Sequence, residues 1–379
     1  AGSKEGGNDS SNTNGNNNTS TNESEELIKL KGEEQLSGVI GKKYKLLVQI
    51  LTSDPRYAKA LADVIKPSQH EKLAKSLNDL TFEIGASLNI IKSLIGLEFN
   101  RKHQHPTTIL RVNSIVSKMM GKYTTRVGTK YLDTLIGDLV REIYNSKTLQ
   151  LETDVARITT VTTKPTEDGE NSTSSSSNDV NEQAKRNLQD LESTCQKFVD
   201  RITAPAMIDV MPREIKAIAY FLAEAGEKYK LDFDTYVMPL ISGFIMLRYI
   251  APAITLPQNA GIVTKIPEGN VRTNLTYIAK VCQKLANGEK FEIETPHLMP
   301  INQFLERNKQ KWRTYIKNIF KYPNEQEGRL PFGDLIKSIT FEDIHLRKFN
   351  IEELIFLHGL IYDYGYEMIV SLQTEVILT

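Results

Sequence analysis

An all-α fold is the class that this sequence of 379 residues predicts. Apolar residues recur every three or four positions over several long stretches, which is the period of an amphipathic helix. Asp, Ser and Asn stand where these stretches begin, as residues that cap helix N-termini do. No stretch alternates between apolar and polar residues over several successive strands, as a sheet would require.

The first predicted helices carry start signals. Asp54 followed by Pro55 is typical of an N-cap with proline at the first helical position. Ser68 and Glu71 have the spacing of a capping box. The apolar positions after this box predict one long amphipathic helix; they are Leu73, Leu77, Leu80, Ile84, Leu88, Ile91 and Ile95.

Later stretches repeat the pattern. Apolar stripes occur at Tyr131/Leu132, Leu135/Ile136, Leu139/Val140 and Ile143/Tyr144, at Leu188, Leu191, Cys195 and Phe198, and at Ile215, Ile218 and Leu222. Asn350 and Glu353 form a capping pattern ahead of Leu354, Leu357, Leu360 and Ile361. Residues 237–254 are the most apolar, but Pro239, Arg248 and Pro252 interrupt them. They predict a helix buried in protein and not one that spans a membrane.

Two polar tracts are expected to be disordered, one before the expected domain and one inside it. Residues 1–26, which begin Ala1-Gly2-Ser3 as tag-derived chains do, are rich in Asn, Ser, Thr and Gly and are expected to be disordered. A second such tract, about 162–183, is expected to be a disordered surface insertion. The helical domain is expected over 27–379, with a core at about 44–322 and C-terminal helices at about 323–379.

Composition argues against several functions. Lys plus Arg and Asp plus Glu are both 47, so the formal net charge is zero, which disfavours a general nucleic-acid binder. The two cysteines, Cys195 and Cys282, and the six histidines show no metal-ligand spacing, so no metal site and no disulfide framework is expected. Residues 38–43 (GVIGKK) lack the spacing of a phosphate-binding loop. Any nucleotide must therefore come with a partner.

Two arginines stand apart. Arg248 lies in residues 240–250, where apolar residues cover every helix face, so it is expected to be buried and to need acceptors. It is either a core ion pair or a residue that braces a site. Arg111 follows Pro106 and precedes a helix that Asn113 or Ser114 can cap.

The segments around these arginines resemble those of Ras GTPase-activating proteins of the neurofibromin type. Residues 108–114 (TILRVNS), with Lys118 after them, are similar to the arginine-finger segment of that family. Residues 246–254 (MLRYIAPAI), followed by Pro257 and residues 260–262, resemble its Phe-Leu-Arg motif. Residues 277–280 (YIAK) and 285–287 (LAN) form a third match. The resemblance covers about residues 44–322, and the helix of 353–364 is similar to the family's closing helix.

The resemblance implies a regulatory protein that completes the active site of a small GTPase rather than an enzyme with its own substrate. Arg111 would be the finger, and Arg248 would hold the finger loop and help order a switch region of the GTPase. Lys280 would support the GTPase-facing groove, paired with Glu294, and Asn113 and Asn287 would add polar contacts. Asn113 as a plain helix cap and Lys280 as a solvated charge remain alternatives.

The implied partner is a Ras-family GTPase in its GTP form, Ras or Rap. GTP and Mg²⁺ would belong to that partner, and no cofactor is expected in this chain. Neither nucleic acid nor direct membrane contact is expected. The expected location is the cytoplasm, with recruitment to the inner face of the plasma membrane.

Three residues depart from the family pattern. Met246 replaces Phe, Ala251 replaces Asn or Cys, and Val112 stands where a smaller residue adjoins the finger. None removes a charge, although β-branched Val112 restricts the local backbone. Two alternatives remain, namely a GTPase-binding scaffold of the IQGAP kind that does not accelerate hydrolysis, and a helical adaptor without a GTPase partner.

Overall fold

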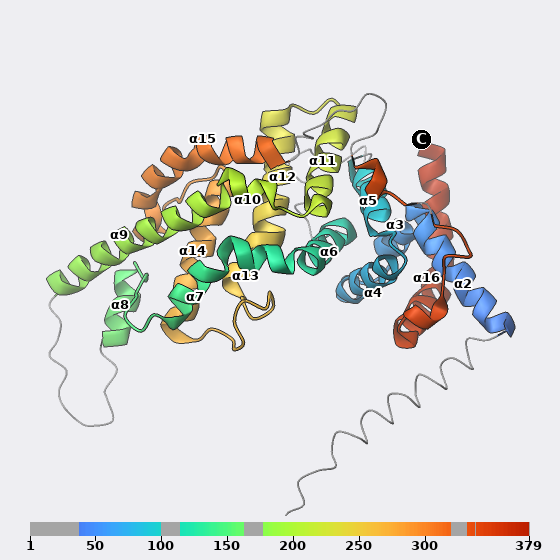
Figure 1. Ribbon diagram of the computed structural model, residues 1–379, viewed down its shortest axis with the longest axis horizontal. Coiled ribbons are helices and arrows are strands. Elements are labelled where there is room, and N and C mark those ends of the chain that lie inside the picture. The colour runs from blue at the N-terminus through green and yellow to red at the C-terminus, as the bar shows by residue number, and fades with distance from the viewer. Residues whose placement is uncertain (1–37, 100–113, 163–176, 320–331, 338, 379) are drawn as a thin grey trace, which may run out of the picture.

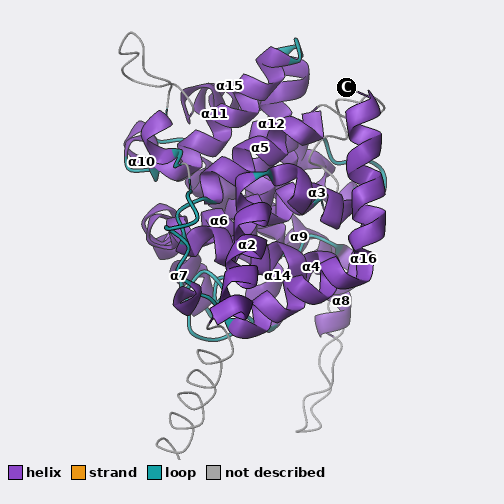
Figure 2. Cartoon of the chain, turned by 90° about the vertical axis from the view of Figure 1, so that its right-hand side faces the viewer, coloured by secondary structure: helices purple, strands orange, loops and turns teal. Residues whose placement is uncertain are grey.

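The computed structural model describes residues 38–99, 114–162, 177–319, 332–337 and 339–378. Helices joined by loops make up this part of the chain, and no β-strand occurs in it (Figure 2). The all-α prediction is confirmed.

One end of the elongated molecule combines the first helices with the last one (Figure 1). It contains α2 (Gly38–Ser53), α3 (Pro55–Val64), α4 (His70–Glu83), α5 (Ser87–Phe99) and α16 (Ile351–Leu378). Helix α16 packs on α3 and α4, so the two ends of the described chain support each other.

The middle and the other end hold the remaining helices (Figure 1). These are α6 (Ile115–Leu132), α7 (Asp138–Asn145), α8 (Val155–Thr162), α9 (Ser177–Ile202), α10 (Pro205–Asp209), α11 (Arg213–Lys228), α12 (Met238–Ile245), α13 (Ala251–Thr255), α14 (Gly269–Asn287) and α15 (Asn302–Ile319). Short 3₁₀ turns are η1 (Pro67–Gln69), η6 (Pro296–Ile301), η7 (Gly333–Leu335) and η8 (Leu346–Lys348). Helix α14 is central, since α7, α9, α12, α13 and α15 all pack against it.

Most start signals are confirmed, but two predictions are wrong. Asp54 caps α3 by accepting a hydrogen bond from the backbone N–H of Arg56 at 3.0 Å, and Asn350 accepts one from Glu352 N–H at 2.9 Å. Ser68 caps nothing, because it lies inside η1 and α4 begins only at His70. The long helix predicted over 73–95 is two helices, because Gly85 adopts a left-handed φ of 73° between α4 and α5.

Prolines explain two π-helical turns. Segments η4 (Phe233–Val237) and η5 (Met246–Ile250) each end two residues before a proline, Pro239 and Pro252. Proline has no N–H and its ring clashes with the carbonyl four residues earlier, so an α-helical turn is unfavourable there. A turn with i→i+5 hydrogen bonds accommodates it.

Together these segments form one helix from Phe233 to Thr255. It is the one helix of the described residues that is long and apolar enough to cross a membrane, with a mean hydropathy of 1.7. In the structure 67% of its apolar window is buried by other helices, as in a core helix. The prediction that residues 237–254 are buried in protein is confirmed.

The structure bears on one of the predicted limits, that of the insertion. Helix α9 begins at Ser177, so the last part of the insertion expected at 162–183 is helical, while 163–176 lie outside the described residues.

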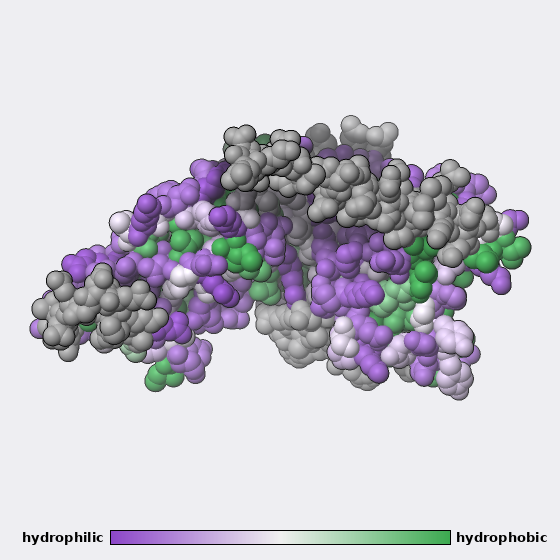
Figure 3. Space-filling model, turned by 90° about the horizontal axis from the view of Figure 1, so that it is seen from below, coloured by the Kyte–Doolittle hydropathy of each residue, from purple (hydrophilic) through white to green (hydrophobic). Residues whose placement is uncertain are grey.

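From below, hydrophilic side chains gather over the middle of the face, between the two ends of the molecule (Figure 3).

Candidate functional site

Arg248 lies in η5 at the wall of a pocket of about 220 Å³. Its side chain is half-buried, and the neighbouring Leu247 is 39% exposed. The prediction that every face of this helix is buried is therefore wrong, because one face of η5 reaches the surface. Burial lowers the pKa of Arg248, but guanidinium groups stay protonated in proteins. Arg248 thus presents a permanent charge at the pocket.

Small residues on α6 allow η5 to approach closely enough to place Arg248. Tyr249, only 1% exposed, points into the core and donates a hydrogen bond to the carbonyl of Gly128 at 2.7 Å. A Cβ added at Gly128 would lie 2.0 Å from the Tyr249 hydroxyl, and one at Gly121 would lie 3.5 Å from the Arg248 carbonyl oxygen. Glycine at position 128 is therefore required by the close packing of α6 and η5.

The pocket brings together two of the residues predicted from sequence. Its lining residues come from α6, α12, η5 and the end of α14; they are Ser117, Met120, Pro239, Leu240, Gly243, Phe244, Leu247, Arg248, Asn287 and Glu289. Asn287 donates a hydrogen bond from Nδ2 to Oε1 of Glu289 at 3.4 Å. Arg248 and Asn287 share this pocket although 39 positions separate them in the sequence.

Buried polar contacts hold the end of α14 in place. The Ser242 hydroxyl of α12 donates to the Ala286 carbonyl at 2.6 Å and accepts from Trp312 Nε1 of α15 at 2.7 Å. Gly288 then ends the helix with a left-handed φ of 68°. The core thereby determines where Asn287 lies.

Lys280 lies two helical turns before Asn287 on α14, about 10 Å along the axis. Its Nζ is 5.7 Å from the centre of the Phe291 ring. Burial lowers the pKa of Lys280, and the positive charges of Lys284 and Arg157 lower it further. Glu294 is exposed, and no ion pair between it and Lys280 occurs among the described residues. Lys280 thus lies near an aromatic ring in this structure, and its pairing with Glu294 stays a prediction.

Except for Ser114, the predicted finger segment falls outside the described residues, and so do Arg111, Val112 and Asn113. Ser114 caps α6 by accepting a hydrogen bond from Ser117 N–H at 3.3 Å. Of the two predicted caps, Asn113 and Ser114, it is Ser114 that makes this capping hydrogen bond. The departures Met246 and Ala251 are both buried, at 1% and 0% exposure, so they contribute to the core and not to the pocket surface.

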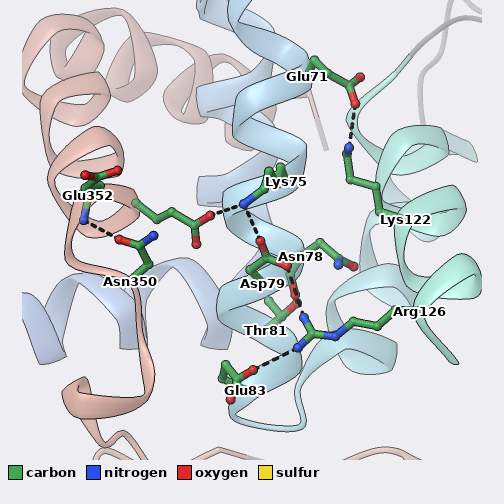
Figure 4. A network of polar contacts seen from close by, with 11 residues as sticks. Glu71, Lys75, Asn78, Asp79, Thr81, Glu83, Lys122, Arg126, Asn350 and Glu352 are labelled. Carbon is green, nitrogen blue, oxygen red and sulfur yellow. Dashed lines mark hydrogen bonds and ion pairs between the residues drawn. The ribbon is translucent and has the colours of Figure 1, made fainter. Parts of the chain in front are cut away.

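A second group of charged residues was not recognised as a group from the sequence, although Lys118 and Glu71 were each named there for other reasons. Helix α6 carries a basic row, Lys118, Lys122 and Arg126, at intervals of four residues, and this row faces carboxylates of α4. Figure 4 shows Lys122 and Arg126 of this row with their partners on α4. Glu71 receives Lys118 and Lys122, each at 2.6 Å. Arg126 pairs with Asp79 at 3.2 Å and with Glu83 at 3.0 Å. The repeated spacing was visible in the sequence, but only the fold shows that the rows face each other.

Comparison with known proteins agrees with this architecture. Residues 90–287 match the RasGAP family, described as GTPase-activator protein for Ras-like GTPase. Neurofibromin-A of Dictyostelium discoideum is 31% identical over 78% of this chain and 32% of its own length. The human Ras GTPase-activating protein nGAP is 27% identical over 69% of this chain and 21% of its length, and human Ras GTPase-activating-like protein IQGAP2 is 24% identical over 85% and 22%.

The described residues thus form an all-helical domain, in which Arg248 lies at a π-helical turn and shares a pocket with the end of the central helix α14. The match to the family gives the class of protein, a GTPase activator. The chain belongs to the family of GTPase-activator proteins for Ras-like GTPases. It spans about a third or less of the length of these relatives.

Proposed function

We propose that this chain accelerates GTP hydrolysis by a Ras-family GTPase, Ras or Rap, and that Arg111 enters the GTPase active site. The observation that carries the proposal is the family match over residues 90–287, which includes Arg111, Arg248 and Asn287. Two relatives are named Ras GTPase-activating proteins or neurofibromin. The activity switches signalling off, since it returns the GTPase to its GDP form.

The chemistry requires charge more than covalent assistance. As the bond to the leaving phosphate breaks, negative charge grows on the phosphate oxygens, and a planar guanidinium can donate several hydrogen bonds to them. For Ras-family GTPases an arginine supplied in trans is already known to give a rate gain of roughly 10³- to 10⁵-fold. Mg²⁺, the phosphate-binding loop and the attacking water would belong to the GTPase.

The described residues support this role for Arg111 by their positions. Arg111 stands three positions before Ser114, and a chain of that length spans at most about 11 Å. Ser114 caps α6, whose next turn, at Ser117, lines the pocket of Arg248. We assign to Arg248 the support of the finger segment, and to Asn287 and Lys280 contacts with the GTPase surface. The GTPase would then recruit this chain from the cytoplasm to the plasma membrane.

The test is single-turnover phosphate release from GTP-loaded Ras and, separately, from GTP-loaded Rap. The wild-type chain is expected to accelerate release from at least one of them. Arg111→Ala should abolish at least about 10³-fold of that acceleration while binding is largely kept. Arg307→Ala is the matched control, because Arg307 is an exposed arginine of α15 paired with Glu192. Equal rates for wild type and Arg111→Ala would refute the finger.

The similarity to IQGAP2 favours one second candidate, a scaffold that binds the GTPase without accelerating hydrolysis. Complex formation with GDP-bound GTPase separates the two. Aluminium fluoride, which mimics the transferring phosphate, should strengthen the complex only if an arginine completes the transition-state site. Binding that ignores aluminium fluoride, with no acceleration, would establish the scaffold.

A further inference from the structure

Helix α16 has one face that packs on α3 and α4 and an opposite face that is exposed. Large apolar side chains form a row along the exposed face, with exposed fractions of 52% for Ile355, 84% for Tyr362, 78% for Tyr366 and 56% for Ile369. Figure 3 shows hydrophobic side chains at the end of the molecule that holds α2 and α16. Single exposed apolar residues are common, but a continuous row of them marks an interaction surface.

The spacing within this row is that of a coiled-coil seam. The row consists of positions at intervals of four, three, four and three residues, over about 21 Å of the helix; they are Ile355, Gly359, Tyr362, Tyr366 and Ile369. A Cβ added at Gly359 would meet nothing within 4 Å, so packing within this chain does not require glycine there. Because α3 and α4 already hold α16 in place, a second helix can pack along the row without the cost of forming α16.

One edge of the row is acidic. With about 100° of rotation per residue, the exposed Glu352, Asp363 and Glu367 all lie on the same side of the row. One cation, Lys72 of α4, lies near this edge, where its Nζ is 4.2 Å from the centre of the Phe356 ring. Three carboxylates against one ammonium group leave this edge negative.

The other edge of the row is basic, because α2 lies beside it. His358 lies on this side of α16, and its Nδ1 is 3.3 Å from the hydroxyl oxygen of Tyr44 of α2. The exposed Lys42 and Lys43 directly precede Tyr44, and α2 contains no acidic residue. The row therefore runs between a negative edge and a positive one.

We propose that α16 binds α16 of a second copy of this chain, with the two helices parallel about a two-fold axis. The orientation follows from the edges. A two-fold axis that runs along the helices brings the acidic edge of each copy to the basic edge of the other, whereas an antiparallel pair brings edges of like charge together.

The dimer leaves the pocket of Arg248 open in both copies. Helix α16 lies at one end of the molecule, whereas α12 and α14, which help to line the pocket, lie in its middle and toward its other end (Figure 1). The inference is thus independent of the proposed function, and either can fail without the other.

The first test is sedimentation equilibrium of the whole chain. A short seam belongs to the low end of interface sizes, so we expect a dissociation constant of roughly 10 µM. Tyr362→Lys introduces a charge into the seam and should raise this constant at least about tenfold. Ile293→Lys is the matched control, since Ile293 is 82% exposed and lies outside the row, and it should leave the constant unchanged.

The second test reverses the edges. One variant carries Lys42→Glu with Lys43→Glu, and another carries Asp363→Lys with Glu367→Lys. At low salt each variant alone should bind itself at least about tenfold more weakly than wild type, because edges of like charge then meet. An equal mixture of the two variants should dimerise again, because every contact then joins opposite charges.

Thermal melting by circular dichroism confirms that each variant is folded, which exposed positions allow. A wild-type chain that stays monomeric at concentrations well above the expected constant overturns the proposal. So does a dimer that Tyr362→Lys does not weaken, or edge variants that dimerise alone as strongly as wild type. A chain that stays monomeric but floats with vesicles of anionic phosphatidylserine, in a manner that Tyr362→Lys abolishes, would make the row a membrane contact instead.

Discussion

Two groups of residues near Arg248 are held in place by different physical means. On the pocket side, buried contacts hold the functional residues: Tyr249 donates to Gly128, and Ser242 joins α14 to Trp312. Between α4 and α6, exposed ion pairs hold the charged side chains in place. Buried contacts are costly to break, whereas exposed pairs contribute little stability. Substitutions around the pocket should therefore lower the free energy of unfolding. Substitutions in the ion pairs between α4 and α6 should mainly change the surface charge.

The largest effect is expected from Gly128→Ala. The new Cβ would lie 2.0 Å from the Tyr249 hydroxyl, so the ring must move and its hydrogen bond to the Gly128 carbonyl is strained. We expect the free energy of unfolding to fall by about 3 kcal/mol. Urea denaturation measures this change.

Gly96→Ala in α5 is the matched control, because a Cβ there meets nothing within 4 Å. Alanine is favoured over glycine inside a helix, so this variant should be more stable by about 0.5–1 kcal/mol. A similar response at both glycines would contradict the close approach of α6 and η5.

The next effect concerns the buried contact that holds the end of α14. Ser242→Ala leaves the indole N–H of Trp312 without its acceptor and should cost about 1–3 kcal/mol of unfolding free energy. Trp312→Phe removes the donor and leaves a smaller ring in the core. Because the two residues share one hydrogen bond, the double variant should lose clearly less than the two single losses together. Additive losses would show that the contact contributes nothing.

The sequence predicted the helices better than their ends and breaks. Apolar periodicity identified the core faces, since the stripes of α9 and α11 are buried at Leu191, Phe198 and Ile218. It missed the break at Gly85, because a glycine is compatible with a helix until its φ is known. It also overstated the burial around Arg248, because a helical pattern does not say which segment of a helix reaches the surface.

The site was predictable in its parts but not in its assembly. Motifs singled out Arg248 and Asn287, which the fold places in one pocket. Lys280 was selected too, but its contact is with Phe291, because residues after α14 fold back in a way that no local pattern encodes. The basic row of α6 was overlooked, since charges spaced by four residues usually mark a solvated helix face. Only tertiary packing shows that a row of carboxylates faces it.

The smallest effect is a change of stability with pH at Glu71. Hydrogen bonds from Lys118 and then Lys122 lower the pKa of Glu71 from 4.5 to about 2. A carboxylate whose pKa is lower in the folded state stabilises the fold above its unfolded pKa and loses this contribution as pH falls through the folded one. The stability difference between wild type and Glu71→Gln should therefore be constant from pH 7 to 5 and disappear between about pH 4.5 and 2. Because Glu71 is mostly exposed, that difference should stay below about 1 kcal/mol in urea denaturation. Glu294→Gln, which also removes an exposed carboxylate, corrects for the change in overall charge. A difference that persists at pH 2, or one that Glu294→Gln reproduces, would mean that the lysines of α6 do not hold Glu71 in the folded protein.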